Sequence, residues 1–272
     1  MSRNAVSEPS STGAPAPTPP GSSSGPGGLS RRSWLVIGLV AALLVAATIV
    51  AVVVEAVGRD RGPAGDPAIA WTVQAPLADR TEVALEVLDG ATDIRVVVED
   101  VQDDLLRART PQGGAVAPRI SDDGDLVQVG LDDTGNGGAG VVEIALHPDV
   151  LWSIRVLGGA TTQQVDLSGA RVSAVELAGG ASTMDLMLPQ PQGTVTVRMT
   201  GGVSTWRIEL PARVPVQVRV GSGAGSVSVD GERRDGIGGG ETISSPDWAE
   251  ATDRYDVDAA AGFSDLTVTR AD

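Results

Sequence analysis

The segment Leu177–Leu188, "LAGGASTMDLML", places two glycines and two hydroxyl residues between runs of alternating apolar residues. Close relatives of this segment recur along the chain. When the copies are aligned on the residue that follows the glycines, the aligned positions lie 21, 22 and 21 residues apart; they are Ala160, Ala181, Val203 and Ala224. A fixed period of this length is typical of a repeat protein built from one supersecondary unit.

Each copy contains two predicted strands. Before the glycines, two apolar residues enclose a charged one, as in Ile-Arg-Val at 154–156 and Val-Glu-Leu at 175–177. After the glycines the same alternation returns, as in Met-Asp-Leu at 184–186. Alternation with a period of two gives a strand one buried face and one exposed face.

Glycines form the corner between the two strands of a copy. We expect them to supply the positive φ that a tight turn needs. The structural corner glycines predicted on this basis are Gly159, Gly180, Gly202 and Gly223. At the other corner, the segments "LSGARV", "LPQPQG" and "LPARVP" contain Gly or Pro, which end the second strand.

Two further copies, around Ala91 and Phe263, bring the number of repeats to six. A two-strand unit cannot bury its apolar face alone and has to stack on its neighbours. The sequence therefore predicts an all-β fold, a β-solenoid-like stack of ~21-residue repeats. An antiparallel β-sandwich is the alternative, because it buries the same alternate residues. The close match of like positions between copies favours the solenoid.

The first 70 residues differ from the rest. Residues 1–30 are rich in Ser, Pro, Gly and Ala, a composition that indicates a disordered tail. Residues 31–55 include 21 uncharged residues, Trp34–Val54, long enough for a transmembrane helix of ~31 Å. Residues 56–70 are predicted to be a linker, and residues 71–272 the β-repeat domain. A cleavable signal peptide, cut near Ala56, is the alternative to a membrane anchor.

The arginines beside the apolar segment bear on its orientation. Arg31 and Arg32 precede it directly, while Arg59 and Arg61 follow it at a short distance. The adjacent pair favours a cytoplasmic N-terminus. We therefore expect a single-pass protein of the cell membrane whose C-terminal domain is extracytoplasmic.

Composition restricts the chemistry. The net charge is −15, and since only Glu8 and three arginines precede Glu55, the remaining chain carries −17. This acidity argues against a nucleic-acid partner, because phosphate backbones are bound by basic surfaces. The chain has no Cys and one His, and all of its 20 basic residues are Arg. With abundant Ala, Gly, Val and Pro, this composition suggests a GC-rich, actinobacterial source.

Few residues are candidates for metal binding or catalysis. His147 precedes a proline and is expected to be a turn residue, because no second His or Cys accompanies it. Two acidic turns contain oxygen ligands suited to Ca²⁺, but they lack the spacing of an EF-hand loop. Their residues are Asp122, Asp123, Asp125, Asp132, Asp133 and Asn136. We expect ordinary turns, no cofactor and no metal.

Two rows of polar residues follow from the alignment. Arg155, Arg198 and Arg219, beside Glu176, are predicted to form a charge ladder on an exposed face, where a protein or an anionic glycan would bind. The hydroxyls of Thr161, Ser182 and Ser204, each followed by a threonine, are expected to bond the corners and not to act as nucleophiles, because no base lies in these copies. Residues 231–252 interrupt the repeat, and Trp248 within them is predicted either to bind a partner or to cap the open end of the stack.

A family resemblance follows from these features. With one membrane segment, Gly-Gly-Ala-Ser/Thr corners and the closing segment "SSPDWAEATDRYDVDAAAGFSDLTV", residues 244–268, the chain resembles membrane-anchored β-strand-repeat proteins of bacteria. These form the putative-adhesin or LiaF-C-terminal-like class, also called toastrack or DUF4097-type domains. The resemblance covers about residues 75–270. It implies a β-solenoid-like domain and a link to envelope stress sensing or scaffolding, and it implies no catalytic residue.

The sequence leads to one preferred function and two alternatives. A non-enzymatic envelope domain that binds or scaffolds an envelope protein or wall component is preferred. The alternatives are a carbohydrate-active enzyme of the parallel β-helix type and a structural adhesin. The enzyme would need carboxylates from adjacent coils, whereas Asp185 has Gln164 and Arg207 at the aligned positions.

Overall fold

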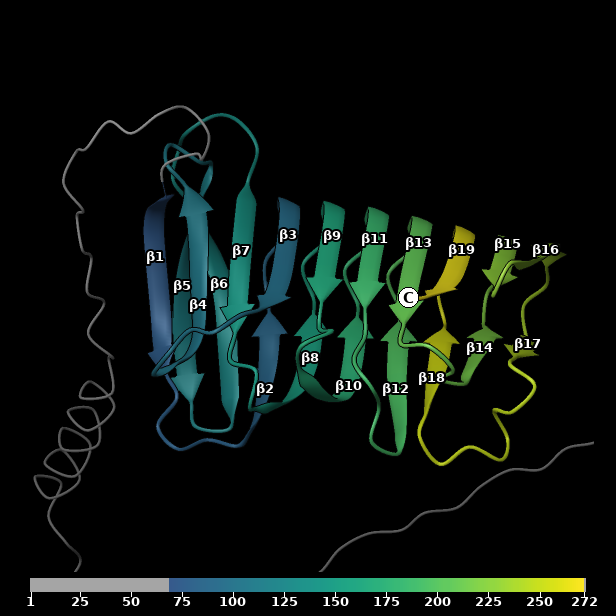
Figure 1. Cartoon of the computed structure of the whole chain (residues 1–272). Coiled ribbons are helices and arrows are strands. Elements are labelled where there is room, and N and C mark those ends of the chain that lie inside the picture. The colour runs from purple at the N-terminus through teal and green to yellow at the C-terminus, as the bar shows by residue number, and fades with distance from the viewer. Residues whose placement is uncertain (1–68, 272) are drawn as a thin grey trace, which may run out of the picture. The chain divides into compact units, whose positions relative to one another are not determined.

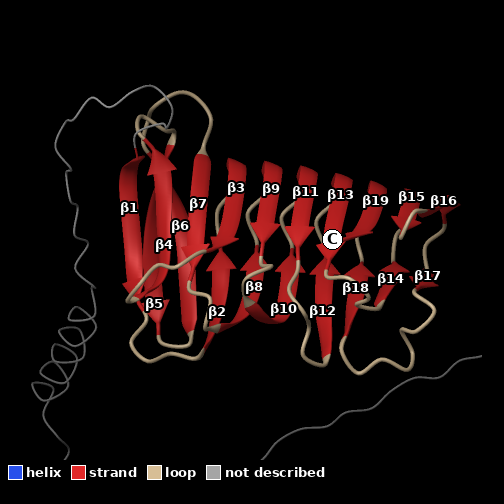
Figure 2. Ribbon diagram, viewed as in Figure 1, coloured by secondary structure: helices blue, strands red, loops and turns tan. Residues whose placement is uncertain are grey.

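The computed structural model describes residues 69–271, which form two large β-sheets (Figures 1 and 2). Sheet A has ten strands, in the spatial order β1 (Ile69–Pro76), β4 (Asp104–Pro111), β7 (Val141–Leu146), β3 (Ala91–Val98), β9 (Ala160–Asp166), β11 (Ala181–Met187), β13 (Val203–Leu210), β19 (Phe263–Arg270), β15 (Ala224–Val229) and β16 (Glu232–Ile237). Sheet B has nine strands, in the order β17 (Glu241–Ser244), β14 (Val216–Val220), β18 (Arg254–Ala259), β12 (Thr194–Met199), β10 (Arg171–Leu177), β8 (Leu151–Val156), β2 (Glu82–Val87), β6 (Leu126–Asp133) and β5 (Val116–Asp123). The fold is all-β over this range, as predicted.

The tail, the membrane segment and most of the linker predicted for residues 1–70 lie outside the described residues. Strand β1 begins at Ile69, two residues before the expected start of the β-repeat domain. In the part of the chain that the structure describes, no helix is both long and apolar enough to span a membrane.

Strands of the two sheets combine into stacked coils. Each coil is one strand of sheet B followed by one strand of sheet A, and neighbouring coils pair in parallel with like positions in register. Ala181, for example, pairs with Ala160 on one side and with Val203 on the other. The antiparallel alternative therefore does not describe these coils, and the parallel stack does.

The stack contains seven coils, one more than the sequence predicts. The additional coil, β6–β7, pairs in parallel with β2–β3. Its two strands are separated by the loop at residues 134–140, "TGNGGAG", which is longer than the glycine corners of the other coils. Because of this longer loop, the coil does not fit the 21-residue period.

The coils do not stack in chain order at either end. Coil β18–β19, the last in the sequence, lies between β12–β13 and β14–β15. Phe263 of β19 accordingly pairs with Val203 on one side and Ala224 on the other. The aligned copies at Val203 and Ala224 are consecutive in sequence but are not neighbours in space (Figure 1).

Antiparallel strands cap both ends of the stack. At one end β4 pairs with β7, β1 with β4, and β5 with β6. At the other end β16 pairs with β15 and β17 with β14. The sequence that interrupts the repeat thus supplies two capping strands, β16 and β17.

The core lies between the two sheets and follows the predicted alternation. In β12, for example, Val195, Val197 and Met199 are buried while the residues between them are exposed. The largest fully buried side chains include Trp152, Trp206 and Tyr255. Full burial of a side chain the size of Val or Leu contributes ~1.5–3 kcal/mol, so a core with many such residues holds the coils together.

Candidate functional site

The corner glycines are required for a reason other than the predicted one. Gly159, Gly180 and Gly202 do not have a positive φ, and of the four predicted corner glycines only Gly223 does, at 104°. The prediction of a left-handed corner is therefore wrong for three of the four. The corners need a residue without a side chain, because the backbones of adjacent coils lie so close together there that a Cβ atom would not fit.

The closest approach involves the first glycine of each pair. A Cβ atom added to Gly179 would lie 2.0 Å from the carbonyl oxygen of Gly158, and one added to Gly158 would lie 2.0 Å from that of Asp89. The second glycines have more room: the nearest atom to an added Cβ is at 3.0 Å for Gly180 and 3.6 Å for Gly202. The corner thus excludes side chains most strictly at its first glycine.

Hydrogen bonds between coils explain why the corners are so close. The amide N–H of Ala160 donates to the Gly180 carbonyl across 3.0 Å, and that of Ala181 donates to the Gly202 carbonyl across 3.1 Å. These bonds continue the sheet pairing around the corner. The stack is therefore hydrogen-bonded along its glycine corners as well as through its two sheets.

A ladder of alternating charges crosses the outward face of sheet B. Its residues are paired in register on neighbouring strands from β2 to β14: Glu86, Arg155, Glu176, Arg198, Asp258 and Arg219. The three arginines predicted to form a partner surface all belong to this ladder. Glu86 and Asp258 were missed, although they occupy the same position, five residues before Ala91 and Phe263, as the arginines do in their copies.

Ion pairs join the ladder. Arg155 contacts both neighbours, Glu176 across 3.0 Å and Glu86 at a shorter distance. Farther along, Arg198 lies 3.7 Å from Asp258. The last member, Arg219, pairs with Asp256 across 3.0 Å. The arginines are therefore not free cations, and the surface offers alternating signs rather than a basic patch.

A strip of small side chains runs beside the sheet B ladder. Two residues earlier on the same strands, the in-register positions on β2, β8, β10 and β12 are Ala84, Ser153, Ala174 and Thr196. On β18 the strip ends at Asp256, which turns toward Arg219. Because these side chains are short, the ladder borders a shallow strip where an extended partner could lie against the sheet.

Sheet A carries a shorter ladder. Arg109, Glu143 and Arg95 lie in register on β4, β7 and β3, and Arg109 Nε donates to Glu143 across 2.7 Å. The row continues through Gln164 and Asp185 to Arg207, and the last two form an ion pair of 3.0 Å. Asp185 thus has Gln164 and Arg207 as neighbours, as the sequence predicts, so carboxylates of adjacent coils do not meet there.

Trp248 attaches the loop between β17 and β18 to strand β18. Its indole N–H donates to the Tyr255 carbonyl across 2.9 Å, and the Arg254 guanidinium lies 4.2 Å from the ring centroid. The side chain is half-buried. Trp248 therefore holds the loop between β17 and β18 onto β18, whereas the end of the stack is capped by β16 and β17.

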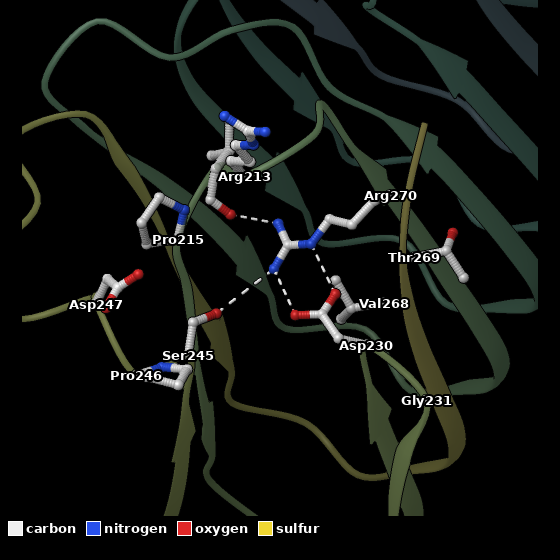
Figure 3. Close-up of a pocket in the computed structure, with 11 residues that line it drawn as sticks. Arg213, Pro215, Asp230, Gly231, Ser245, Pro246, Asp247, Val268, Thr269 and Arg270 are labelled. Carbon is white, nitrogen blue, oxygen red and sulfur yellow. Dashed lines mark hydrogen bonds and ion pairs between the residues drawn. The ribbon is translucent and has the colours of Figure 1, made fainter. Parts of the chain in front are cut away.

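A groove of about 500 Å³ lies where the segments before β14 and after β15 and β17 meet the end of β19 (Figure 3). Arg270 points into it and forms two bonds with Asp230, of 2.7 and 2.9 Å. The same guanidinium also donates to the Val214 carbonyl and, across 3.4 Å, to Ser245 Oγ. Since its donors are engaged, Arg270 joins four segments of chain, and the groove is a structural junction.

The remaining candidates lie partly in turns and partly in strands. His147, Asp125 and Asn136 lie between strands, as predicted, whereas the other acidic candidates end strands β5 and β6, contrary to the prediction of turns: Asp122, Asp123, Asp132 and Asp133. His147 Nδ1 accepts a hydrogen bond from the Asp149 amide across 3.2 Å, and the His147 carbonyl accepts one from the Trp152 indole. Asp122 pairs with Arg80 and Asp132 with Arg119, each across 2.8 Å. Within residues 69–271, no three acidic or histidine side chains come together in a way that would hold a metal ion.

Comparison with known proteins identifies the fold. No protein-family model matches the sequence, and no curated protein matches it. Among solved structures, a putative cell adhesion protein from Clostridium sporogenes ATCC 15579 aligns with a TM-score of 0.56 at 14% identity, over 74% of this chain and 98% of that one. A putative adhesin from Bacteroides fragilis NCTC 9343 aligns over 74% of this chain and 95% of that one at 10% identity, with a TM-score of 0.22. The first of these shows that the all-β fold is shared.

Proposed function

We propose that this chain is a non-enzymatic, single-pass membrane protein whose β-repeat domain binds or scaffolds an envelope protein or wall component outside the cytoplasm. The observation that carries the proposal is the outward face of sheet B. There, six in-register charged residues of alternating sign border a strip of short side chains. Strands in a sheet are spaced by ~4.8 Å, so the face presents fixed charges at a regular interval to an extended partner.

The ion pairs support a binding role because they hold the side chains in place before a partner arrives. Arg155 is held between Glu86 and Glu176, so it loses little conformational freedom on binding. Exposed ion pairs contribute only ~0–1 kcal/mol each to folding, which makes stability alone a weak reason for so long a ladder. The cell adhesion name of the Clostridium sporogenes protein fits an adhesin or scaffold in general terms.

Two finer points belong to the same proposal. We propose that the chain belongs to the toastrack, LiaF-C-terminal-like class that its sequence resembles, with a role in envelope stress signalling. We also propose that Trp34–Val54 anchors it with the β-repeat domain outside the cytoplasm. Protease added to intact spheroplasts should then remove that domain, whereas its survival until the membrane is broken would contradict the orientation.

Co-sedimentation of the full chain with washed envelope fragments tests binding. Replacing Arg155, Arg198 and Arg219 with Gln should reduce the bound fraction at least about ten-fold. The matched control replaces Arg233 and Arg234 on β16, two exposed arginines outside the ladder, and should bind like the wild type. Equal binding by both variants would exclude the sheet B face. Turnover of a wall polysaccharide by the purified chain would favour the enzyme alternative.

A further inference from the structure

The four edge strands of the two sheets differ in how they are protected from pairing with another chain. Strand β5 carries Pro118, Arg119 and two aspartates, and β16 reads Glu-Arg-Arg-Asp over its first four residues. Strand β17 has only four residues and includes a glutamate. Charges, proline and short length are the usual means by which edge strands avoid association. Strand β1, "IAWTVQAP", has eight residues and no charge.

Strand β1 also carries an exposed aromatic side chain. Trp71 is 43% exposed, and among residues 69–271 no other large hydrophobic side chain is exposed. It lies on the same face of the strand as Val73 and Ala75, which are half-buried and buried. On the inner face of β1, exposure thus increases from the buried Ala75 through Val73 to Trp71, whose side chain is exposed to solvent.

One edge of β1 pairs with no other strand of residues 69–271, and its backbone groups are available for pairing. The His147 amide donates to the Leu105 carbonyl, so the backbone groups of Leu105 point toward β7. Backbone groups alternate in direction along a strand, so those of every second residue of β4 from Leu105 onward also point toward β7. The backbone groups of Leu106, Ala108 and Thr110 therefore point toward β1. Those residues pair with Trp71, Val73 and Ala75. The N–H and C=O groups of Thr72 and Gln74 therefore point away from β4, toward the open edge.

We propose that β1 is the interface between two copies of this chain, which pair antiparallel about a two-fold axis through Val73. In this register Thr72 of each copy bonds to Gln74 of the other, and Trp71 lies opposite the small Ala75 of the partner copy. The register fits a second copy because it is self-complementary: each copy offers the same outward N–H and C=O groups to the other. Two copies are both acidic and repel each other, but the repulsion is weakest at β1, the edge strand of the described sheets that carries no charge. Two-fold dimers are the commonest oligomers, and edge pairing joins their sheets directly.

Single-cysteine cross-linking of the full chain tests this interface, because the chain has no cysteine of its own. Directly opposite positions in an antiparallel pair lie within disulfide reach, so Val73→Cys should give a disulfide-linked dimer under mild oxidation. The control is Arg234→Cys on β16, the exposed edge at the other end of sheet A. Val73→Cys should yield at least about ten-fold more dimer than this control.

A second substitution separates edge pairing from other modes of association. Gln74→Pro removes only an outward N–H, so it should leave the pairing with β4 and the melting temperature nearly unchanged. Combined with Val73→Cys, it should reduce the cross-linked dimer to the level of Arg234→Cys. Undiminished cross-linking in the combined variant, or equal yields from Val73→Cys and Arg234→Cys, would overturn the proposal.

Discussion

Arg155 Nε donates to Glu176 Oε2 across 3.0 Å, from the neighbouring parallel strands β8 and β10. The two residues lie in register, 21 positions apart in sequence, as successive coils require. On its other side Arg155 contacts Glu86 of β2. One guanidinium therefore links three coils on the outward face of sheet B.

Arg155→Glu should lower the free energy of unfolding by about 1 kcal/mol. The substitution removes two partly exposed ion pairs and places three carboxylates side by side on β2, β8 and β10. Because salt screens exposed charges, the loss should shrink in 1 M NaCl. Urea unfolding at low and high salt checks this, with Arg155→Gln as the control that removes charge without repulsion. A loss independent of salt would mean that packing, and not charge, is responsible.

Gly179→Ala should destabilise the protein by about 2 kcal/mol or more, because the new Cβ would lie 2.0 Å from a backbone oxygen that cannot move freely. Gly202→Ala, with its nearest atom at 3.6 Å, should change stability by no more than about 0.5 kcal/mol. Thermal melts of the two variants measure the difference. If Gly202→Ala proves the more damaging, close approach of the coils is not what the corners require.

Arg270→Lys should cost about 1–2 kcal/mol although it keeps the charge. A lysine cannot reproduce the two bonds to Asp230 together with those to Val214 and Ser245. Chemical denaturation measures the loss, and Arg213→Lys in the same groove is the control, since the Arg213 side chain points away from Arg270 (Figure 3). Equal effects of the two substitutions would show that the junction does not depend on the guanidinium.

Tyr255, the one tyrosine of the chain, makes a pH-dependent prediction. Its hydroxyl donates to the Pro189 carbonyl across 2.9 Å, and burial raises the pKa of this phenol well above its ordinary value of ~10. The unfolded chain releases this proton more readily than the folded protein does. The contribution of the protonated Tyr255 phenol to the free energy of unfolding is therefore complete below pH ~10 and is lost as the pH rises further. Tyr255→Phe should remove that part of the alkaline loss.

Ultraviolet absorbance of tyrosinate follows this titration directly, because no other tyrosine contributes. Between pH 10 and 11 the folded protein should show no tyrosinate, and the signal should appear together with the loss of circular dichroism. At neutral pH, Tyr255→Phe should cost about 1–2 kcal/mol, since it leaves the Pro189 carbonyl without its partner. A tyrosinate signal in folded protein near pH 10 would contradict the burial of the phenol.

The alternation of side chains was predictable because every coil buries the same alternate positions. Ile154, Val175 and Val197 are all buried as the alignment requires. The order of the coils was not predictable, since the order of segments in the sequence does not determine where a coil lies in the stack. Coil β18–β19 follows β14–β15 in the chain but lies between β12–β13 and β14–β15 in the stack. The alignment gives Asp258 the same position as Arg198 and Arg219, but only the order of the coils shows that it lies between them.

The corner glycines show a second limit of sequence-based prediction. A repeated Gly-Gly is compatible both with a positive φ and with close contact between backbones, and the two differ only in how adjacent coils are placed. Close contact is what the structure shows, because a Cβ atom added to Gly158 or Gly179 would lie 2.0 Å from a carbonyl oxygen of the neighbouring coil. The capping strands β16 and β17 were also missed, because antiparallel caps interrupt the period on which the prediction depended.

If the outward face of sheet B binds the envelope, a bulky side chain on that face should block binding, whereas the same side chain on the outward face of sheet A should not. Thr196 on β12 and Thr205 on β13 belong to the same coil but lie on the outward faces of opposite sheets. Either can be replaced with Trp, which strands accept well. The measurement is the affinity of each full-length variant for washed envelope fragments, with the melting temperature as a check on folding. Thr196→Trp should bind at least about ten-fold more weakly, while Thr205→Trp should bind like the wild type; undiminished binding by folded Thr196→Trp would show that the outward face of sheet B is not the binding surface.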